Sequence, residues 1–277
     1  MYQELKAVQH AELYILKEIK RICEKHNIKY FLTGGTMLGA VRHQGFIPWD
    51  DDIDIAMVKE EYEKFLSIAP SELGDEFFLD NEETDDDYGL VFSKVRLLGT
   101  KFIELKGNEN ANHNELFVDI FPYFNVSNDK TERAKIGNKL TLLTQLLLVK
   151  SGYHVWRGDG IAKAVKFLPV RILSILFSRK RLRARINSLV NKYPERTQFT
   201  CPNNGSKLGY IYWILPRTVF DEYISVKFED DFFSIPRDYE RCLKTFYGTT
   251  FMELPPEDKR VSHRPIELDL GAYKVID

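Results

Sequence analysis

Apolar residues recur at steps of three and four along the N-terminal segment of the chain. They are Leu5, Val8, Ala11, Ile15, Ile19 and Ile22. This spacing places them on one face of an α-helix, and it predicts a long amphipathic helix at the start of the fold. Asn27 is expected to end this helix.

Shorter apolar runs follow, and their alternation predicts strands separated by short helices and turns. The expected strands cover 28–32, 53–58, 91–98 and 116–121, and the expected short helices cover 37–41 and 60–68. A loop is expected around Pro48, because a proline disfavours helix at the residue before it. The first strand runs into Gly34 and Gly35, so a glycine turn follows a strand end.

The second half of the chain has a different pattern. Helices are expected from about residue 130 to residue 192, and a strand is expected over 223–228. Pro236 is expected to open a further helix that Gly248 ends. This order of strands and helices predicts a protein of the α/β (α+β) class.

The chain has 277 residues, of which 44% are hydrophobic. That is enough to bury one large core, or one core with an appended subdomain. We therefore predict an α/β part over residues 1–125, a helical subdomain over 126–222 and a C-terminal segment over 223–277 that returns to the first part.

Charge and cysteine usage narrow the function classes. The formal net charge is −2, which argues against a nucleic-acid partner. Cys23, Cys201 and Cys242 are far apart and form no CxxC pair, so neither a zinc ribbon nor a disulfide framework is indicated. The N-terminus lacks the apolar stretch of a signal peptide, and no run of 18 uncharged apolar residues occurs. A cytoplasmic protein is expected.

Residues 34–57 combine a glycine turn with a run of acids at a predicted strand start. Strand alternation predicts that Asp52 and Asp54 lie on the same face. Two neighbouring carboxylates repel, and a divalent cation relieves the repulsion; Mg²⁺ commonly takes one or two carboxylates together with phosphate oxygens. Asp119, in the next predicted strand, is placed to share a second ion in a two-metal clamp on a phosphoryl group. Gly34 and Gly35 would let the backbone approach such phosphates.

Other motifs compete for the same residues. The acids match four positions of an EF-hand loop, but Ile55 stands where that loop requires glycine. Gly34 and Gly39 have P-loop spacing, but Ala40 stands where the lysine belongs. A DxD pair also suits a metal-dependent glycosyltransferase that binds a nucleotide-sugar, and this alternative stays open.

Residues 35–57, GTMLGAVRHQGFIPWDDDIDIAM, resemble the signature of the LicD family, relatives of the fukutins. The resemblance continues in 117–122, 235–239, Tyr247-Gly248 and His263. It implies a nucleotidyltransferase-like mixed-sheet core with an added helical subdomain. It also implies Mg²⁺-dependent transfer, with Mn²⁺ as the alternative ion, of a phospho-alcohol such as phosphocholine. The donor would be CDP-linked, and the acceptor would be a sugar hydroxyl of a teichoic acid, lipopolysaccharide or capsule precursor.

The resemblance carries roles to particular residues. Asp52 and Asp54 match the paired metal ligands, and Asp119 matches the third carboxylate, which is either a metal ligand or the general base. Asp50 is a further candidate ligand. The expected substrate-binding residues are Gly34, Gly35 and Thr36 of the glycine turn, the cations Arg42, His43 and Lys94, and His263 near the end.

Structural roles compete with several of these assignments. Arg42 is equally consistent with an exposed charge at a helix end, and His43 with an ordinary surface or core histidine. Lys94 and Arg96 leave one face of a predicted strand, which is more often the solvent face than a diphosphate contact. A capping role is as consistent with His263 as contact with phosphate.

Two stretches of like charge remain. The segment 161–186 carries eight lysines and arginines with no acid, interleaved with apolar residues. Such a basic amphipathic helix either docks peripherally on an anionic membrane at its inner face, near a lipid-linked acceptor, or packs on the core with a solvated basic end. The acidic stretch 72–87 is predicted to be a solvated loop. Tyr88, Tyr123 and Phe124 are candidates for an aromatic cage around a choline group.

Overall fold

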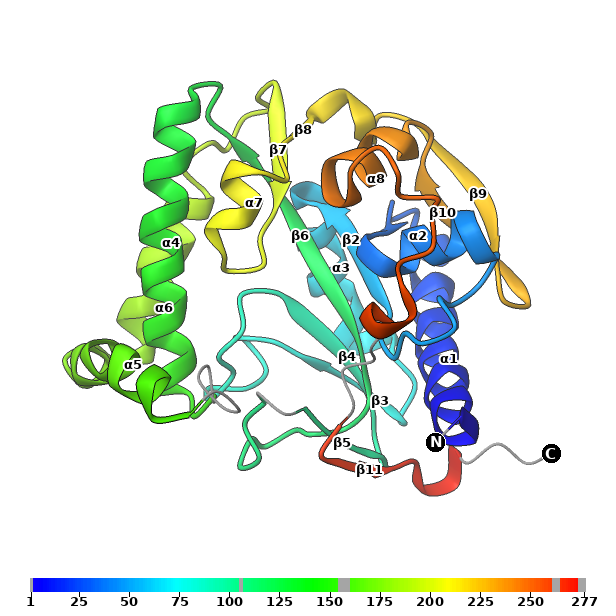
Figure 1. Ribbon diagram of the computed structural model, residues 1–277, viewed down its shortest axis with the longest axis horizontal. Coiled ribbons are helices and arrows are strands. Elements are labelled where there is room, and N and C mark those ends of the chain that lie inside the picture. The colour runs from blue at the N-terminus through cyan, green and yellow to red at the C-terminus, as the bar shows by residue number, and fades with distance from the viewer. Residues whose placement is uncertain (1, 105–106, 154–159, 261–264, 274–277) are drawn as a thin grey trace.

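The computed structural model describes residues 2–104, 107–153, 160–260 and 265–273, with side chains described except at Tyr2 and 160–167. Within it, seven strands form one mixed sheet around a long central strand (Figure 1). Five strands lie side by side in the order β1 (Phe31–Leu32), β2 (Asp54–Val58), β6 (Phe117–Val126), β4 (Ser93–Leu97) and β3 (Phe77–Asp80). The predicted α+β class with a mixed sheet is confirmed.

β2 and β6 run parallel, whereas β1, β4 and β3 join the sheet by antiparallel pairing. The second half of β6 continues past β2 and pairs with β7 (Phe199–Pro202), which in turn pairs with β8 (Leu215–Pro216). β6 is therefore bordered by different strands along its length, and its first half lies between β2 and β4.

One face of the sheet is covered by α1 (Tyr2–His26) and α3 (Lys59–Glu72), which contact each other and both pack on β6. The apolar stripe of α1 is buried as its spacing predicts; Ile15, Ile19 and Ile22 are all fully buried. Asn27 ends the helix at φ 49°, and the next amide donates to Cys23 O at 2.8 Å. The predicted helix and its end are confirmed.

α2 (Gly34–His43) begins two residues after β1, and its first turn is therefore fixed at a strand end. β1 is shorter than the strand expected over 28–32. β2 starts at Asp54, so Asp52 lies in the preceding loop. The argument that strand alternation places Asp52 beside Asp54 is wrong for that reason, and another feature must bring the two acids together.

A second group of helices packs beside the second half of β6: α4 (Lys130–Lys150), α5 (Gly160–Ile175), α6 (Arg179–Val190) and α7 (Lys207–Ile211). They enclose a separate hydrophobic cluster that includes Leu140, Leu147, Leu182 and Phe124. Asp129 caps α4 by accepting from the amides of the next turn, and Ser178 caps α6 in the same way. No helix in the described ranges has the length and apolar character needed to cross a bilayer.

The acidic stretch 72–87 is not a solvated loop throughout. It contains β3, and Asp80 and Asp85 are buried. The Arg183 guanidinium on α6 donates to four backbone carbonyls of this stretch and its neighbour, those of Glu82, Asp85, Asp86 and Tyr88. The loop is therefore held against the helical part by charge-assisted hydrogen bonds.

The C-terminal segment contributes a hairpin, β9 (Tyr223–Phe228) with β10 (Asp231–Pro236), then α8 (Tyr239–Tyr247) and a strand β11 (Glu267–Asp269) that pairs with β5 (Lys101–Ile103). Three 3₁₀ helices cover Arg217–Phe220, Glu257–Lys259 and Gly271–Tyr273. The strand over 223–228 and the helix end at Gly248 are confirmed. The expectation that Pro236 opens a helix is wrong, because Pro236 closes β10 opposite Tyr223.

Candidate active site

Two acids occupy paired positions at the centre of the sheet. Asp54 begins β2, Asp119 is the third residue of β6, and their Cα atoms are partners in the parallel ladder. The Asp119 amide donates to Ile53 O at 3.0 Å, and the Asp54 amide donates to Thr36 Oγ1 at 2.8 Å. The first bond holds Asp119 on the strand beside Asp54, and the second joins Asp54 to a side chain in the first turn of α2.

The glycine turn lies against these acids. Gly34 has φ +53°, a conformation that glycine adopts without steric cost. A Cβ at Gly34 would lie 3.0 Å from Asp54 Oδ2, and one at Gly35 would lie 2.8 Å from Asp50 Oδ2. Only glycine leaves space for the two carboxylates beside this backbone, so Asp50 and Asp54 both border the turn.

The acids raise one another's pKa values. Burial raises the pKa of Asp54 well above its usual range, and the charges of Asp52, Asp119 and Asp50 raise it further. Burial also raises the pKa of Asp119 to about 6, although the Lys94 ammonium opposes the increase. Asp52 therefore acts on Asp54 from the loop before β2, and the site accumulates unfavourable negative charge.

Lys94 is the cation that opposes this charge. It faces Asp119 across the antiparallel β4–β6 ladder, and its Nζ lies 2.8 Å from Asp119 Oδ1. The ammonium also lies 3.0 Å from the centre of the Phe117 ring. The side chain is 4% exposed. The interpretation of Lys94 and Arg96 as a solvent face is wrong, because Arg96 is also buried and pairs with Asp80 at 2.5 Å.

Carboxylate oxygens are the ligands that Mg²⁺ prefers, and the ion typically needs only one or two of them, with water and phosphate completing its coordination. The pair Asp54 and Asp119 fits this chemistry. Asp52 and Asp50 lie close enough to raise the pKa of Asp54 and are further candidate ligands. Over the residues that the structure describes, no three acidic, histidine or cysteine side chains converge as a ready-made metal cage. A bound Mg²⁺ would therefore depend on substrate phosphate for part of its coordination.

A buried acid on α1 also borders the site, and the sequence patterns did not single it out. Glu12 is 1% exposed. Burial raises its pKa well above the usual range, with further contributions from Asp52, Asp51 and Asp50. One turn earlier, Gln9 donates to Asp50 O at 2.7 Å. The available signal was the polar pair Gln9 and Glu12, three residues apart inside an otherwise apolar helix face.

Two cavities open beside the acid pair. One, of about 230 Å³, is lined by the glycine turn, Asp54 and aromatic side chains. These aromatics are Phe121, Tyr123, Trp213, Phe246 and Tyr247. The other, of about 340 Å³, is lined by Asp119, Lys94, Glu104 and Tyr153 together with apolar residues. Phe121 of the first cavity and Phe92 of the second are in ring contact, with centroids 4.4 Å apart. We call them the aromatic cavity and the Lys94 cavity.

The aromatic cavity is formed by segments far apart in the sequence. Trp213 and Phe246 meet edge to face with ring centroids 5.8 Å apart. Burial raises the pKa of Tyr247 above its usual range, and Asp54 is the largest charge that adds to this increase. The structure thus places Trp213 in a cavity wall beside the acids.

Arg42 and His43 lie at the opposite end of α2 from the glycine turn. Arg42 donates to the backbone carbonyls of Phe251 and Glu253, both at 3.1 Å, and to His43 Nε2 at 2.9 Å. Burial, followed by the charge of Arg42, lowers the pKa of His43. Arg42 therefore attaches α2 to the C-terminal segment. His263 lies outside the described residues.

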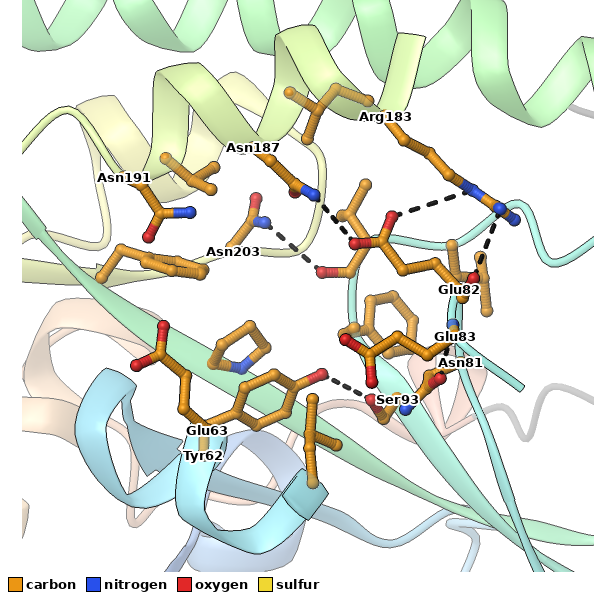
Figure 2. Close-up of a pocket in the computed structure, with 18 of the residues that line it drawn as sticks. Tyr62, Glu63, Asn81, Glu82, Glu83, Ser93, Arg183, Asn187, Asn191 and Asn203 are labelled. Atoms are coloured by element: carbon orange, nitrogen blue, oxygen red, sulfur yellow. Dashed lines mark hydrogen bonds and ion pairs between the residues drawn. The ribbon is translucent and has the colours of Figure 1, made fainter. Parts of the chain in front are cut away.

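The three aromatics considered for a choline cage do not come together. Tyr123 lines the aromatic cavity, whereas Tyr88 is buried and donates to Phe92 O at 2.8 Å. Phe124 instead lines a third cavity, between α3, α6 and the loop around Asn81, shown in Figure 2. That cavity is rimmed by the ion pair of Arg183 with Glu82 and by several amides, but neither Asp54 nor Asp119 lines it.

Comparison with known proteins agrees with the geometry. Residues 27–141 match the family described as LicD/FKTN/FKRP, nucleotidyltransferase domain. The lipopolysaccharide cholinephosphotransferase LicD of Haemophilus influenzae is 30% identical over 91% of this chain and 92% of its own length. The ribitol 5-phosphate transferases FKRP of Mus musculus and Homo sapiens are each 28% identical over 43% of this chain and 21% of theirs. The match to the family spans the glycine turn and all the central acids.

Proposed function

The chain belongs to the LicD family, and we propose that it is a transferase that moves a phospho-alcohol from a CDP-linked donor to a sugar hydroxyl of a glycan. The observation that carries the proposal is the register of Asp54 and Asp119 on parallel strands beside the glycine turn. Relatives named for cholinephosphate and ribitol 5-phosphate transfer support phospho-alcohol transfer to glycans as the common activity. We infer that the transferred group is phosphocholine, because a relative that aligns with nearly the whole chain is named as a cholinephosphotransferase.

The reaction would proceed as a displacement at phosphorus. The acceptor hydroxyl oxygen forms a bond to the β-phosphorus of the donor, and the bond from that phosphorus to the oxygen bridging to CMP breaks. CMP leaves with the electron pair, and the hydroxyl proton passes to Asp119. A carboxylate with a pKa of about 6 is a stronger base than an ordinary aspartate, which suits it to this role.

Asp54, with Asp52, would hold Mg²⁺, Asp50 would lie at the edge of the same group, and Asp119 would be left to act as the base. When bound, the ion would neutralise the donor diphosphate and the charge that develops on the leaving group. The chain itself orients the donor, because the backbone of Gly34 and Gly35 faces the acids without side chains in between. The protein's contribution is then mainly positioning and electrostatic stabilisation.

We assign the two cavities to the two substrates. The aromatic cavity contains the glycine turn and would take one end of the donor, since aromatic rings stack on a cytosine base or surround a quaternary ammonium. The Lys94 cavity would take the acceptor, because its hydroxyl must reach Asp119. The ring contact of Phe92 with Phe121 lies between the two.

The test is release of the nucleotide product in the presence of Mg²⁺ and a glycan acceptor, which is CMP from CDP-choline, CDP-ethanolamine, CDP-ribitol or CDP-glycerol and UDP from UDP-sugars. We expect one CDP-alcohol to be used, and Asp54→Asn and Asp119→Asn each to lower kcat/KM by about 10²–10⁴-fold. Asp230→Asn, which removes only a surface ion pair with Lys17, should keep wild-type activity. Turnover of UDP-sugars alone would replace the proposal with a glycosyltransferase.

A further inference from the structure

Exposed apolar side chains concentrate on α5 and the residue after it. Of the fourteen large hydrophobic residues exposed in the described part of the chain, five lie within 168–176. They are Leu168, Ile172, Leu173, Ile175 and Leu176, and the last two are each 70% exposed. We call these five residues the apolar strip. So dense a group is unusual on the surface of a soluble domain and marks a site of interaction.

The strip faces away from the body of the protein. Leu168, Ile172 and Ile175 follow one another at helical steps of four and three and so share one side of α5. Ser174 is buried and Val170 packs against the hydrophobic cluster of the helical part, and both lie on the opposite side. α5 is therefore apolar on two sides, and the protein covers only one of them. Figure 1 shows α5 at an outer end of the molecule, beside the foot of α4 and away from α2 and β2.

The charged residues that neighbour the strip in the sequence are all basic. No acid occurs from Ile161 to Pro194 in the sequence. Arg179 pairs with Asp87 at 2.5 Å, and Arg183 holds the acidic loop, so these two cations are already engaged. Arg171, Lys180 and Arg181 are exposed, and no described carboxylate pairs with them. Arg171 lies on α5 within the strip, and Lys180 and Arg181 lie on the first turn of α6, four and five residues after it; we call these three cations the basic rim.

We propose that the apolar strip and its basic rim dock the protein on an anionic lipid bilayer. The apolar side chains would enter the boundary between headgroups and acyl chains while α5 lies in the membrane plane, and the rim would contact the anionic headgroups. A second copy of this chain fits the surface less well. A two-fold contact through the strip would bring Lys180 and Arg181 of each copy toward the same cations of the other, and like charges would repel.

The experiment is flotation of the full-length protein with two vesicle preparations, one of phosphatidylcholine alone and one with phosphatidylglycerol added. We expect binding to the anionic vesicles that weakens with salt. Ile172→Ser/Ile175→Ser/Leu176→Ser should weaken it by at least about ten-fold. Lys180→Gln/Arg181→Gln should weaken it by about thirty-fold, since each basic residue near an anionic surface contributes about five-fold. Phe232→Ser/Met252→Ser removes apolar side chains of similar exposure elsewhere and should bind as wild type does.

Light scattering, circular dichroism and CMP release on the same variants complete the test. Absence of vesicle binding in the wild type overturns the proposal. So does a wild-type dimer that the triple variant converts to monomer without any vesicle binding, because the strip would then contact a second copy. Equal binding to neutral and anionic vesicles, unchanged in Lys180→Gln/Arg181→Gln, also overturns it. The two rim residues are exposed, so this variant remains informative even if the triple variant fails to fold.

Discussion

Lys94 and Asp119 face each other on antiparallel strands, and the Lys94 ammonium lies 2.8 Å from the Asp119 carboxylate. The same lysine contacts the face of the Phe117 ring at 3.0 Å from its centre. Both side chains are largely buried, so their charges interact through protein more than through water. Burial raises the pKa of Asp119 and Lys94 limits that increase, so this pair controls how the proposed base responds to pH.

Replacing Lys94 with methionine should move the acidic limb of the pH–activity profile upward. Asp119 has to be deprotonated to accept the proton, and its pKa of about 6 already includes the lowering effect of Lys94. Without that ammonium the pKa of Asp119 rises further, and activity should appear only at a higher pH. The measurement is log kcat/KM for CMP release between pH 5 and 9. Lys101→Met, which removes an exposed partner of Glu267, is the control. An acidic limb that does not move would show that Asp119 is not the titrating base.

Asp54→Asn should raise the thermal stability of the metal-free protein above pH 7. Burial and neighbouring acids raise the pKa of Asp54 in the folded state, so the unfolded chain releases this proton at lower pH than the folded chain does. Folding therefore loses stability as pH rises from the unfolded pKa to the folded one, and the loss stays complete above both. Asparagine removes the loss. Melting in EDTA at pH 4 and pH 8 should show the gain only at pH 8.

The effect of Mg²⁺ on the melting temperature tests whether Asp54 binds the ion or only destabilises the folded protein. Mg²⁺ should raise the melting temperature of the wild type and have little effect on Asp54→Asn. A ligand at about a hundred times its dissociation constant stabilises by about 2.7 kcal/mol. An equal response of both proteins to Mg²⁺ would contradict the assignment of Asp54 as a ligand.

Gly34→Ala should impair the site both by straining the backbone and by placing a methyl group against Asp54. The variant Gly99→Ala carries only the first of these effects. The residue has φ +53°, which costs a non-glycine residue roughly 1–2 kcal/mol, and the new Cβ would lie 3.0 Å from Asp54 Oδ2. Gly99 has φ +79° with no atom within 4 Å of an added Cβ, so Gly99→Ala carries only the backbone strain. Both variants should unfold at lower denaturant concentration, and only Gly34→Ala should lose CMP release. Equal activity of the two variants would argue against the contact with Asp54.

Trp213→Ala should raise KM for the donor with a smaller effect on kcat. Its ring lines the aromatic cavity and contacts Phe246, and loss of one stacking partner costs about 1–3 kcal/mol. Tyr212→Ala is the control, because Tyr212 is 65% exposed and does not line the cavity. The readouts are the KM for the CDP-alcohol and quenching of tryptophan fluorescence by the donor. If the KM for the glycan rose instead, the aromatic cavity would have to bind the acceptor and the Lys94 cavity the donor.

Local patterns predicted the elements of the fold better than their pairing. The long helix ending at Asn27 and the strand over 223–228 follow from periodicity that the structure repeats. The parallel pairing that makes Asp54 and Asp119 neighbours does not follow from periodicity, since it joins strands separated by a helix and three further strands. The candidate site itself could be predicted from the sequence, because the glycine turn and the run of acids lie close together in the chain.

Burial of charge was the least predictable property. Lys94 has the sequence context of a solvent-facing strand position, yet it is buried because Asp119 on the next strand supplies its partner. Glu12 lies on an apolar helix face, and only tertiary structure brings it near Asp52. The sequence pattern of 161–186 placed Arg179 and Arg183 on a solvent-exposed basic helix face, but the acidic loop binds both of them. Such pairs depend on long-range contacts that a single sequence does not reveal.

The strand β6 limits how the molecule can be divided. Its first half carries Asp119 and lies in the core beside β2, and its second half carries Phe124 and Val126 into the hydrophobic cluster of the helical part. A chain cut after residue 125 would remove Val126 from the edge that β7 pairs with. A chimera that joins the helical part of this chain to the α/β part of a relative should therefore fold only if the junction lies outside β6. Natural or engineered chimeras should take this strand whole from one parent.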